Sequence, residues 1–233
     1  MSDISLCYTK QGGGPPFILL HGNGEDGSYF IHQMEYFSSR YTVYAVDTRG
    51  HGRSPRGDAP FTIAQFAQDL SDFMNEHDIL RAPILGFSDG ANIALTFALA
   101  HPGRVSRLIL NGGNLDPSGV KLHVQLPIVL GYKIASMFAG KSPKAKAHAE
   151  MLGLMVNEPH IDPEELKRLR VRTLVIAGTK DMIKDEHTLL IAQSLPRSQL
   201  EVIAGDHFIA SKNPDAFNRA VDKFLLEYKE IFL

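Results

Sequence analysis

The chain has 233 residues, 44% of them hydrophobic, which is enough to bury the core of one α/β domain with a modest insertion. Its 24 Lys and Arg residues nearly balance its 26 Asp and Glu residues, and the net charge of −2 argues against a general nucleic-acid-binding protein. The single cysteine, Cys7, cannot form an intramolecular disulfide, and no apolar run reaches the roughly 18 residues that a membrane span needs. Residues 1–5 lack the basic and apolar regions of a signal peptide, so we expect a soluble cytoplasmic protein.

The first third of the chain predicts alternating strands and helices. Strands are expected at 3–9, 17–20 and 42–46, and helices at 28–38 and 63–77. The run at 17–20 is apolar throughout, which is typical of a strand buried on both faces. Thr62 and Gln65 have the spacing of a capping box at the start of the second helix.

The stretch at 83–95 combines an apolar run, the pattern Gly-x-Ser-x-Gly and a run of good helix formers. This order predicts a strand, a sharp turn with Ser88 at its apex, and a helix that ends before Pro102. Gly86 and Gly90 suit a turn with no room for a Cβ atom. The helix would direct its free N–H groups toward the space beside Ser88. Such a site suits a serine nucleophile, although the pattern alone also occurs in ordinary loops.

The rest of the chain continues the alternation. Strands are expected at 105–110, 171–178 and 199–203, and a last helix begins with Asn213 as its cap and Pro214 in its first turn. The apolar stripe of that helix consists of Phe217, Ala220, Val221, Phe224, Leu225 and Tyr228. Alternation of this kind predicts an α/β fold with a mostly parallel sheet of about seven strands and helices on both faces. Ligands of such sheets bind beyond the carboxyl ends of the strands, where the sequence places His21, Asp47, Ser88, Gly112, Asp181 and His207.

Residues 114–168 contain no convincing strand, so we expect a helical lid inserted into a core formed by 1–113 and 169–233. Its helices are expected near 124–139, 143–156 and 163–169. Its apolar residues are expected to face the sheet domain: Leu126, Ile128, Val129, Leu130, Ile134, Met137, Phe138, Met151, Leu152, Leu154 and Met155. Five lysines and no acid lie between Pro117 and Ala149, a pattern that favours a solvated basic face over steering of an anionic substrate.

A serine hydroxyl needs a base, and the base is usually a histidine oriented by a buried carboxylate. Among ten histidines, His207 is the candidate base because it follows a strand by a short loop and precedes the last helix. Asp181 is the candidate acid because it follows the strand at 171–178. Asp185 is the alternative acid, and Asp206 is a weaker competitor. The order serine, aspartate, histidine is the one expected of a hydrolase on this kind of sheet.

The sequence resembles the α/β-hydrolase superfamily over nearly the whole chain outside the lid. Four motifs carry the resemblance: His21-Gly22 after an apolar strand, Asp47-x-Arg49-Gly50-x-Gly52-x-Ser54, Gly86-x-Ser88-x-Gly90, and Gly178-x-x-Asp181 followed by His207. The resemblance implies an oxyanion hole formed by the backbone N–H groups of Asn23 and Asp89, and a purely structural role for the Asp47–Ser54 loop. The chain departs from relatives at Asp89, where many have a small or apolar residue. The serine nucleophile disfavours the haloalkane dehalogenase and epoxide hydrolase activities, which use aspartate.

The expected function is therefore that of a serine hydrolase that cleaves a small acyl substrate, most simply a carboxylic ester, through an acyl-enzyme. The same triad also serves hydrolysis of carbon–carbon bonds, thioesters or peptides, and lyase steps. A ligand-binding protein that keeps this fold without catalysis is a third hypothesis, which the complete triad disfavours. We expect no metal, no cofactor, no nucleic acid and no membrane span, and either a monomer or a homodimer; the loop at 21–27 lacks the Gly-x-Gly-x-x-Gly of dinucleotide binding.

Overall fold

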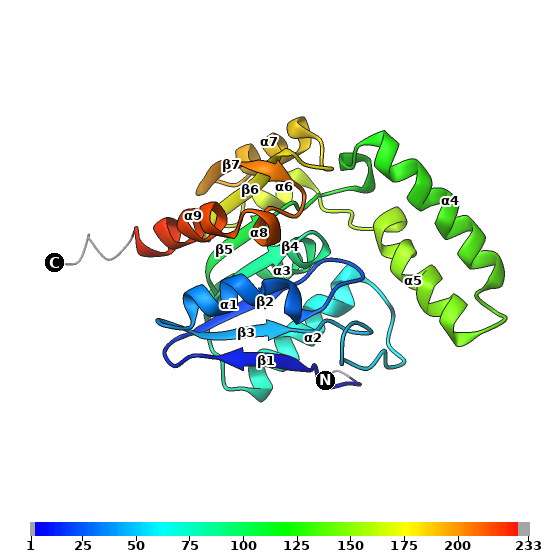
Figure 1. The fold of residues 1–233 in the computed structure, drawn as a ribbon, viewed down its shortest axis with the longest axis horizontal. Helices are drawn as coiled ribbons and strands as arrows, with labels where there is room; N and C mark the ends of the chain where they lie inside the picture. The colour runs from blue at the N-terminus through cyan, green and yellow to red at the C-terminus, as the bar shows by residue number, and fades with distance from the viewer. Residues whose placement is uncertain (1–2, 228–233) are drawn as a thin grey trace.

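A computed structural model describes residues 3–227, in which seven strands form one sheet with helices on both faces (Figure 1). The strands are β1 (Tyr8–Gln11), β2 (Pro16–Leu20), β3 (Thr42–Val46), β4 (Ala82–Phe87), β5 (Val105–Asn111), β6 (Thr173–Lys180) and β7 (Ser198–Asp206). Their order is β1-β3-β2-β4-β5-β6-β7, with β1 antiparallel to β3 and all other neighbours parallel. The predicted fold class, a mostly parallel α/β sheet of about seven strands, is confirmed.

The helices follow the strands in the manner of a parallel sheet. They are α1 (Ile31–Phe37), α2 (Ile63–Glu76), α3 (Asp89–Ala100), α4 (Leu122–Phe138), α5 (Pro143–Asn157), α6 (Pro163–Leu166), α7 (Asp185–Ser194), α8 (Ile209–Lys212) and α9 (Pro214–Leu226). Short 3₁₀ turns cover Gly27–Phe30, Pro102–Arg104 and Pro117–Gly119. The helix predicted at 28–38 is thus divided between a 3₁₀ turn and α1, and α7 and α8 had not been predicted.

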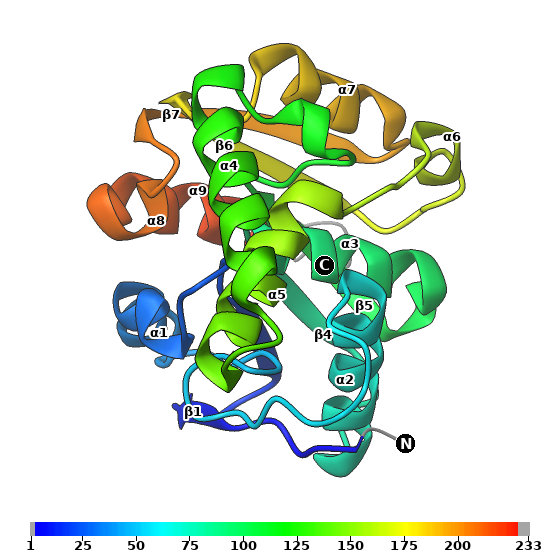
Figure 2. The ribbon, with the colours of Figure 1, turned by 90° about the vertical axis from the view of Figure 1, so that its right-hand side faces the viewer.

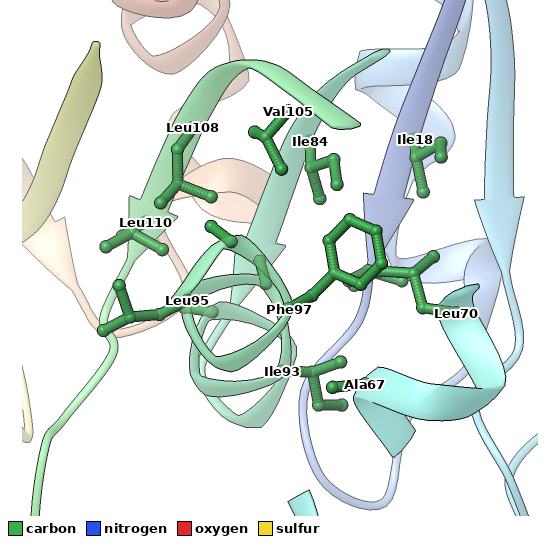
Figure 3. Packing of buried hydrophobic residues seen from close by; sticks show 14 of the residues in the cluster. Ile18, Ala67, Leu70, Ile84, Ile93, Leu95, Phe97, Val105, Leu108 and Leu110 are labelled. Carbon is green, nitrogen blue, oxygen red and sulfur yellow. The ribbon is translucent and has the colours of Figure 1, made fainter. Parts of the chain in front are cut away.

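The core lies on the two faces of the sheet. On one face, α2 and α3 pack on the central strands, where Phe97 of α3 and Leu70 of α2 lie against Ile18 and Ile84 (Figure 3). On the other face, α1 and α9 cover the sheet, and Phe217 of α9 belongs to that second buried cluster. Continuous apolar runs in the central strands are required because both of their faces are buried.

Three predicted strands have clearly different bounds in the structure. The opening strand covers Tyr8–Gln11 instead of 3–9, because the residues before Tyr8 pack against the loop after β3 and not beside a strand. The Cys7 N–H donates to Ser54 Oγ at 2.8 Å, and Arg49 donates to Asp3 Oδ1 at 2.6 Å. The last strand extends to Asp206, so His207 follows it directly and not through a loop. β6 likewise extends to Lys180, which brings Asp181 to the strand end.

Helix caps agree with the prediction only in part. Thr62 Oγ1 accepts the Gln65 N–H at 3.1 Å, but the Gln65 side chain donates to Asp69 and does not complete the capping box. Asn213 does not cap α9 through its side chain, because its Nδ2 donates to the Ala204 carbonyl at 3.0 Å. Tyr228, the last residue of the predicted stripe, lies outside the described residues.

The segment between β5 and β6 is helical, as predicted, but the prediction that its apolar residues face the sheet domain is wrong for the exposed ones on α4. Helices α4 and α5 form a hairpin that projects from the sheet domain, with α4 on the outer side (Figures 1 and 2). Because α4 packs on α5 and not on the sheet, one side of it remains exposed; the exposed residues include Leu126, Leu130, Ile134, Met137 and Phe138. No helix within residues 3–227 combines the length and the apolar character needed to cross a membrane.

Candidate active site

Ser88 lies at the apex of a sharp turn between β4 and α3. Its backbone has φ 54° and ψ −121°, a conformation that is strained for any residue with a side chain. The Ser88 N–H donates to the Asn111 carbonyl at 2.8 Å, which fastens the turn to the neighbouring strand β5. The Ser88 side chain is therefore held at the carboxyl edge of the sheet, and the residue is only partly buried.

Glycines make this turn possible because neighbouring backbone comes too close for any side chain. A Cβ atom on Gly86 would overlap the Gly90 carbonyl oxygen, and a Cβ atom on Gly90 would overlap the Leu20 carbonyl oxygen. On Gly22 a Cβ atom would lie 3.1 Å from the Ser88 Cβ. The predicted reason for the two motif glycines agrees with these contacts, and the His21-Gly22 loop lies directly beside Ser88.

The structure brings His207 and Asp181 together. His207 Nδ1 lies 2.7 Å from Asp181 Oδ1, and both side chains are buried. The carboxylate accepts the Nδ1 proton, so the other ring nitrogen, Nε2, is free to act as a base. His207 Nε2 is buried and has no hydrogen-bond partner among the residues the structure describes. An unpaired buried imidazole nitrogen is costly, and His51 Nε2 is also buried without a partner among these residues.

The surroundings of Asp181 keep its carboxylate ionised. Burial acts to raise its pKa, but the hydrogen bond and the charge of His207 outweigh burial, and the pKa of Asp181 lies below its ordinary value. Backbone N–H groups of Ile183 and Gly178 donate to the two carboxylate oxygens at 3.0 and 3.2 Å. A carboxylate that accepts three hydrogen bonds is held in one orientation, so it also fixes the plane of the imidazole.

The two alternative acids lie elsewhere. The Asp185 side chain is 80% exposed at the start of α7, and its nearest partner is Lys121 Nζ at 3.8 Å. Asp206 forms an ion pair with Lys212 and accepts the Phe208 N–H at 2.9 Å. Neither carboxylate contacts the His207 ring, so the geometry favours Asp181 among the three.

Gly112 provides the space that the His207 ring occupies. A Cβ atom on Gly112 would lie 2.6 Å from His207 Cε1 and 2.8 Å from its Nδ1, and Gly112 has φ 63°. On its other side the ring contacts the Phe87 ring at a centroid distance of 4.8 Å, and Tyr29 stacks on Phe87 at 4.4 Å. The imidazole is thus confined by the Gly112 backbone and by aromatic rings next to the Ser88 turn.

The His21-Gly22 loop presents a free N–H to the site. His21 Nε2 accepts the Thr48 N–H at 3.0 Å, so its Nδ1 carries the proton and donates to the Gly22 carbonyl at 2.7 Å. In a trans peptide the N–H points opposite to the carbonyl, so the Asn23 N–H is directed away from His21. Neither this N–H nor that of Asp89 has an acceptor within residues 3–227.

Asp89 is tied to the same loop by its side chain. Asn23 Nδ2 donates to Asp89 Oδ2 at 2.9 Å and to the Met151 carbonyl of α5 at 2.8 Å. Asn92 Nδ2 lies 3.5 Å from the second Asp89 oxygen and donates to Asn114 Oδ1 at 3.0 Å. The Asp89 carboxyl therefore hydrogen-bonds to side-chain amides next to the proposed oxyanion hole. This polar network links the loop after β2, the start of α3 and the hairpin.

Two carboxyl groups near the nucleophile turn hold their protons more strongly than usual. Burial raises the pKa of Asp89, although the hydrogen bond from Asn23 acts against it. Burial also raises the pKa of Glu25 to about 7, while its Oε2 accepts the Gly22 N–H at 3.3 Å. His207 lies close enough to favour the ionised form of both groups. The negative charge near the site therefore depends on pH.

A cavity of about 440 Å³ opens beside the imidazole. It lies between the start of α4 and the ends of β6 and β7, and His207 and Asp181 contribute to its wall. Lys121 also lines it, and its Nζ donates to the Asp181 carbonyl at 2.6 Å. Ser88 is not among the residues that line this cavity. Within the described residues, no group of three or more His, Cys, Asp or Glu side chains could hold a metal ion.

Some residues of the site were not predicted from the sequence. Asn92 had a signal, since it is a lone amide in an otherwise apolar stretch of α3. Glu25, Lys121 and Met151 had none, because the contacts of Lys121 and Met151 span 60 and 128 positions in the chain and the role of Glu25 arises from burial.

Comparisons with known proteins agree with the fold described above. Residues 15–133, about half of the chain, match the family model described as alpha/beta hydrolase fold. A protein of Caulobacter sp. strain K31, provisionally named carbamate hydrolase RutD, is 28% identical over 261 aligned residues, which cover 95% of this chain and 96% of the relative.

Solved structures with the same fold include hydrolases. An enol-lactonase from Burkholderia xenovorans LB400 superimposes with a TM-score of 0.81, at 22% identity and with coverage of 96% of this chain and 97% of that one. A hydrolase from Pseudomonas aeruginosa PA01 gives a TM-score of 0.79 at 24% identity, with coverage of 95% and 94%. At these identities the likeness establishes the fold of the chain.

Proposed function

The chain belongs to the α/β-hydrolase fold family, and we propose that it is a serine hydrolase that cleaves a small carboxylic ester through an acyl-enzyme. The observation that carries the proposal is the His207 imidazole, whose Nδ1 is bound by Asp181 while its buried Nε2 has no partner within residues 3–227. A base prepared in this way beside a strained serine turn fits acyl transfer.

In the proposed reaction, Ser88 Oγ attacks the ester carbonyl carbon while His207 Nε2 accepts the hydroxyl proton. The carbonyl oxygen becomes an oxyanion, which accepts hydrogen bonds from the N–H groups of Asn23 and Asp89. Each such donor contributes about 3–4 kcal/mol to the transition state. The oxyanion collapses, the alkoxide leaves with the proton from His207, and Ser88 carries the acyl group.

The second half repeats these steps with water. His207 removes a proton from water, the hydroxide attacks the acyl carbon, and the proton returns to Ser88 Oγ as the acid is released. Asp181 remains ionised throughout and stabilises the imidazolium that forms twice in each cycle. No cofactor enters this scheme, because the proton and electron pairs move only between the substrate, water and the three side chains.

The proposal includes a division of the chain into a core of residues 1–113 and 169–233 and a lid of residues 114–168. Support comes from the position of the α4–α5 hairpin (residues 122–157), whose Met151 carbonyl is hydrogen-bonded by the Asn23 side chain beside Ser88. Because the lid is hydrogen-bonded to the loop that carries Asn23, a substrate bound at this loop would also affect the position of the lid. The partly buried state of Ser88 suits a lid that leaves the nucleophile accessible.

Carbamates are a second candidate substrate class, because the relative from Caulobacter bears that name and covers nearly the whole chain. A carbamate presents a carbonyl carbon to the same nucleophile, so the triad does not discriminate between the two. A panel of p-nitrophenyl acetate, p-nitrophenyl butyrate, a p-nitrophenyl carbamate, an acyl-CoA thioester and an aminoacyl amide separates these classes. We expect the highest kcat/KM for one of the oxygen esters.

Labelling with a fluorophosphonate probe tests the nucleophile itself. The expected result is a single adduct on Ser88, absent in Ser88→Ala and retained in Ser39→Ala, whose serine is exposed far from the sheet edge. Hydrolysis of the best ester in the panel should disappear in Ser88→Ala and persist in the control. An unlabelled Ser88 in folded protein would overturn the proposal and favour a ligand-binding role for the fold.

A further inference from the structure

Helix α4 carries a long apolar surface that no other described segment covers. Six exposed side chains form it, and we call them the α4 stripe: Leu122, Leu126, Leu130, Ile134, Met137 and Phe138. Their relative exposures range from 45% for Phe138 to 74% for Met137. Spacings of three and four residues keep them on one side of the helix, and a 17-residue helix is about 25 Å long.

The opposite side of α4 already has a partner. Ala135 is buried, Gln125 Nε2 donates to the Met155 carbonyl of α5 at 3.1 Å, and Gly131 faces the Leu152 side chain. In Figure 2, α4 lies in front of α5, on the outer surface of the molecule. Packing against α5 therefore explains why the inner side of α4 is apolar. It does not explain the apolar residues of the α4 stripe.

Along α4 and the segments directly before and after it, the charged side chains have one sign, while Asp185 and Glu186 of α7 lie beside Leu122 and Leu126 at the start of the stripe. The 33 residues from Pro117 to Ala149 contain five lysines and no acid. Lys133 is exposed within the span of the stripe, and Lys141 Nζ lies 4.8 Å from the centroid of the Phe138 ring at its end. Lys144 is exposed at the start of α5. The lysines are exposed, as expected of a solvated basic face, but the exposed apolar side chains beside them were not expected from the sequence.

We propose that the α4 stripe binds the surface of an anionic lipid assembly, with α4 lying in the plane of the interface. The apolar side chains would enter the boundary between headgroups and acyl chains, and the lysines would contact anionic headgroups. A second copy of this chain fits less well. Two α4 stripes facing each other would bring together segments whose own charged side chains are all lysines, so these lysines would repel one another.

Vesicle co-sedimentation tests the apolar part of the proposal. We expect binding to vesicles of phosphatidylcholine mixed with phosphatidylglycerol, and little binding to phosphatidylcholine alone. The double variant Leu126→Glu, Leu130→Glu should lower the partition coefficient at least about tenfold. Leu80→Glu is the matched control, because Leu80 is 84% exposed outside the hairpin, and it should bind like the original protein. Circular dichroism verifies that each variant is folded.

The charged part has its own variants. Lys133→Gln and Lys141→Gln should each weaken binding to the mixed vesicles about fivefold at low salt, and added salt should reduce the difference. Lys223→Gln provides the control, since Lys223 lies on α9, which Figure 1 places on the other side of the molecule from α4. Equal losses in all three variants would indicate a general effect of net charge and would contradict the proposal.

Two further outcomes would overturn it. Binding that survives Leu126→Glu, Leu130→Glu would place the lipid contact elsewhere. Light scattering could instead show that the original protein is a dimer and that this variant is a monomer, and vesicle binding could be absent. That result would mean that the α4 stripe contacts a second copy of the chain. Ser88→Ala should bind vesicles normally, so failure of the hydrolase proposal and failure of this one are distinguished.

Discussion

The Asn23 side-chain amide donates to Asp89 Oδ2 at 2.9 Å, so the two residues whose N–H groups are the proposed oxyanion donors are joined through their side chains. The same amide binds the Met151 carbonyl of the hairpin. A free carboxylate at position 89 would oppose the negative charge that develops in the proposed oxyanion hole. The carboxyl is held by amides, and burial raises its pKa, which reduces the negative charge it presents.

Asn23→Ala should therefore affect both stability and rate while leaving the backbone donor in place. Asp89 would lose its main hydrogen-bond donor, and leaving a buried carboxyl without it costs about 1–3 kcal/mol in the free energy of unfolding. Urea denaturation measures this loss, and kcat/KM should fall because the loop is no longer fixed. Asn157→Ala, at an exposed asparagine that ends α5, should change neither quantity. Equal behaviour of the two variants would contradict the role of the Asn23 amide.

Asp181→Asn should lower kcat for ester hydrolysis about 10³–10⁴-fold, because an amide cannot hold the productive tautomer of His207 or stabilise its imidazolium. Asp185→Asn is the matched control, since this aspartate also lies near the end of β6 but is exposed and does not contact the ring. Its kcat should stay within about twofold. A larger loss in Asp185→Asn than in Asp181→Asn would reassign the acid.

Gly112→Ala should inactivate the protein more than it unfolds it. The added methyl group would lie 2.6 Å from His207 Cε1, so the ring must turn away from Asp181, and the positive φ adds backbone strain. Steady-state kinetics should show a loss mainly in kcat. Gly103→Ala is the control, because a Cβ atom there meets nothing within 4 Å. Unchanged kcat in Gly112→Ala would mean that the imidazole does not need this position.

Glu25→Gln should change how stability depends on pH. The pKa of Glu25 is raised from 4.5 to about 7, so between these values the folded protein binds a proton that the unfolded chain has released. This contribution is fully present below pH 4.5 and is lost as the pH rises through about 7. The glutamine variant should not show this pH dependence. At pH 8 its free energy of unfolding should exceed that of the original protein by about 1–2 kcal/mol, a value reduced because Glu25 is partly exposed. Denaturation at several pH values measures the difference.

His21 should make the stability of the protein depend on pH in the opposite direction. Burial lowers its pKa from 6.5 to about 4, so the folded protein keeps the ring neutral while the unfolded chain takes up a proton. Its contribution to the free energy of unfolding, about 3 kcal/mol in total, is present above pH 6.5 and is lost as the pH falls through about 4. His21→Asn preserves a donor for the Gly22 carbonyl and removes the titration. Its stability should fall less than that of the original protein between pH 6.5 and 4; an identical pH profile would refute this prediction.

Much of the arrangement follows from short-range patterns. Apolar runs separated by helices predicted parallel strands, and parallel strands place their carboxyl ends at one edge. That rule alone predicted that Ser88, Asp181 and His207 would gather there. Local turn chemistry likewise predicted the glycines at 86 and 90, because the need to omit a Cβ atom arises within a few residues of the turn.

Contacts between distant segments could not be predicted in this way. The Asn23 amide meets Asp89 and Met151 across 66 and 128 positions, and nothing in the local sequence of any of these residues specifies the pairing. Asn213 resembles a helix cap, but its side chain instead bonds to the Ala204 carbonyl, which tertiary packing brings within 3.0 Å. Side-chain hydrogen bonds depend on which backbone groups the whole fold leaves nearby.

Helix α4 also shows what local sequence determines and what depends on contacts between distant segments. Its sequence determined that a helix forms, because helix formation depends on neighbours three and four residues away. Apolar residues occur on several of its sides, so the pattern did not decide which side is buried; the prediction that Leu126 and Met137 face the sheet was wrong. The position of α5 decided it, because burial is a property of the surface that a helix meets. The sequence by itself thus determined the strands, the helices other than α7 and α8, and the sheet edge. Only the tertiary structure decided which side chains there meet and which face solvent.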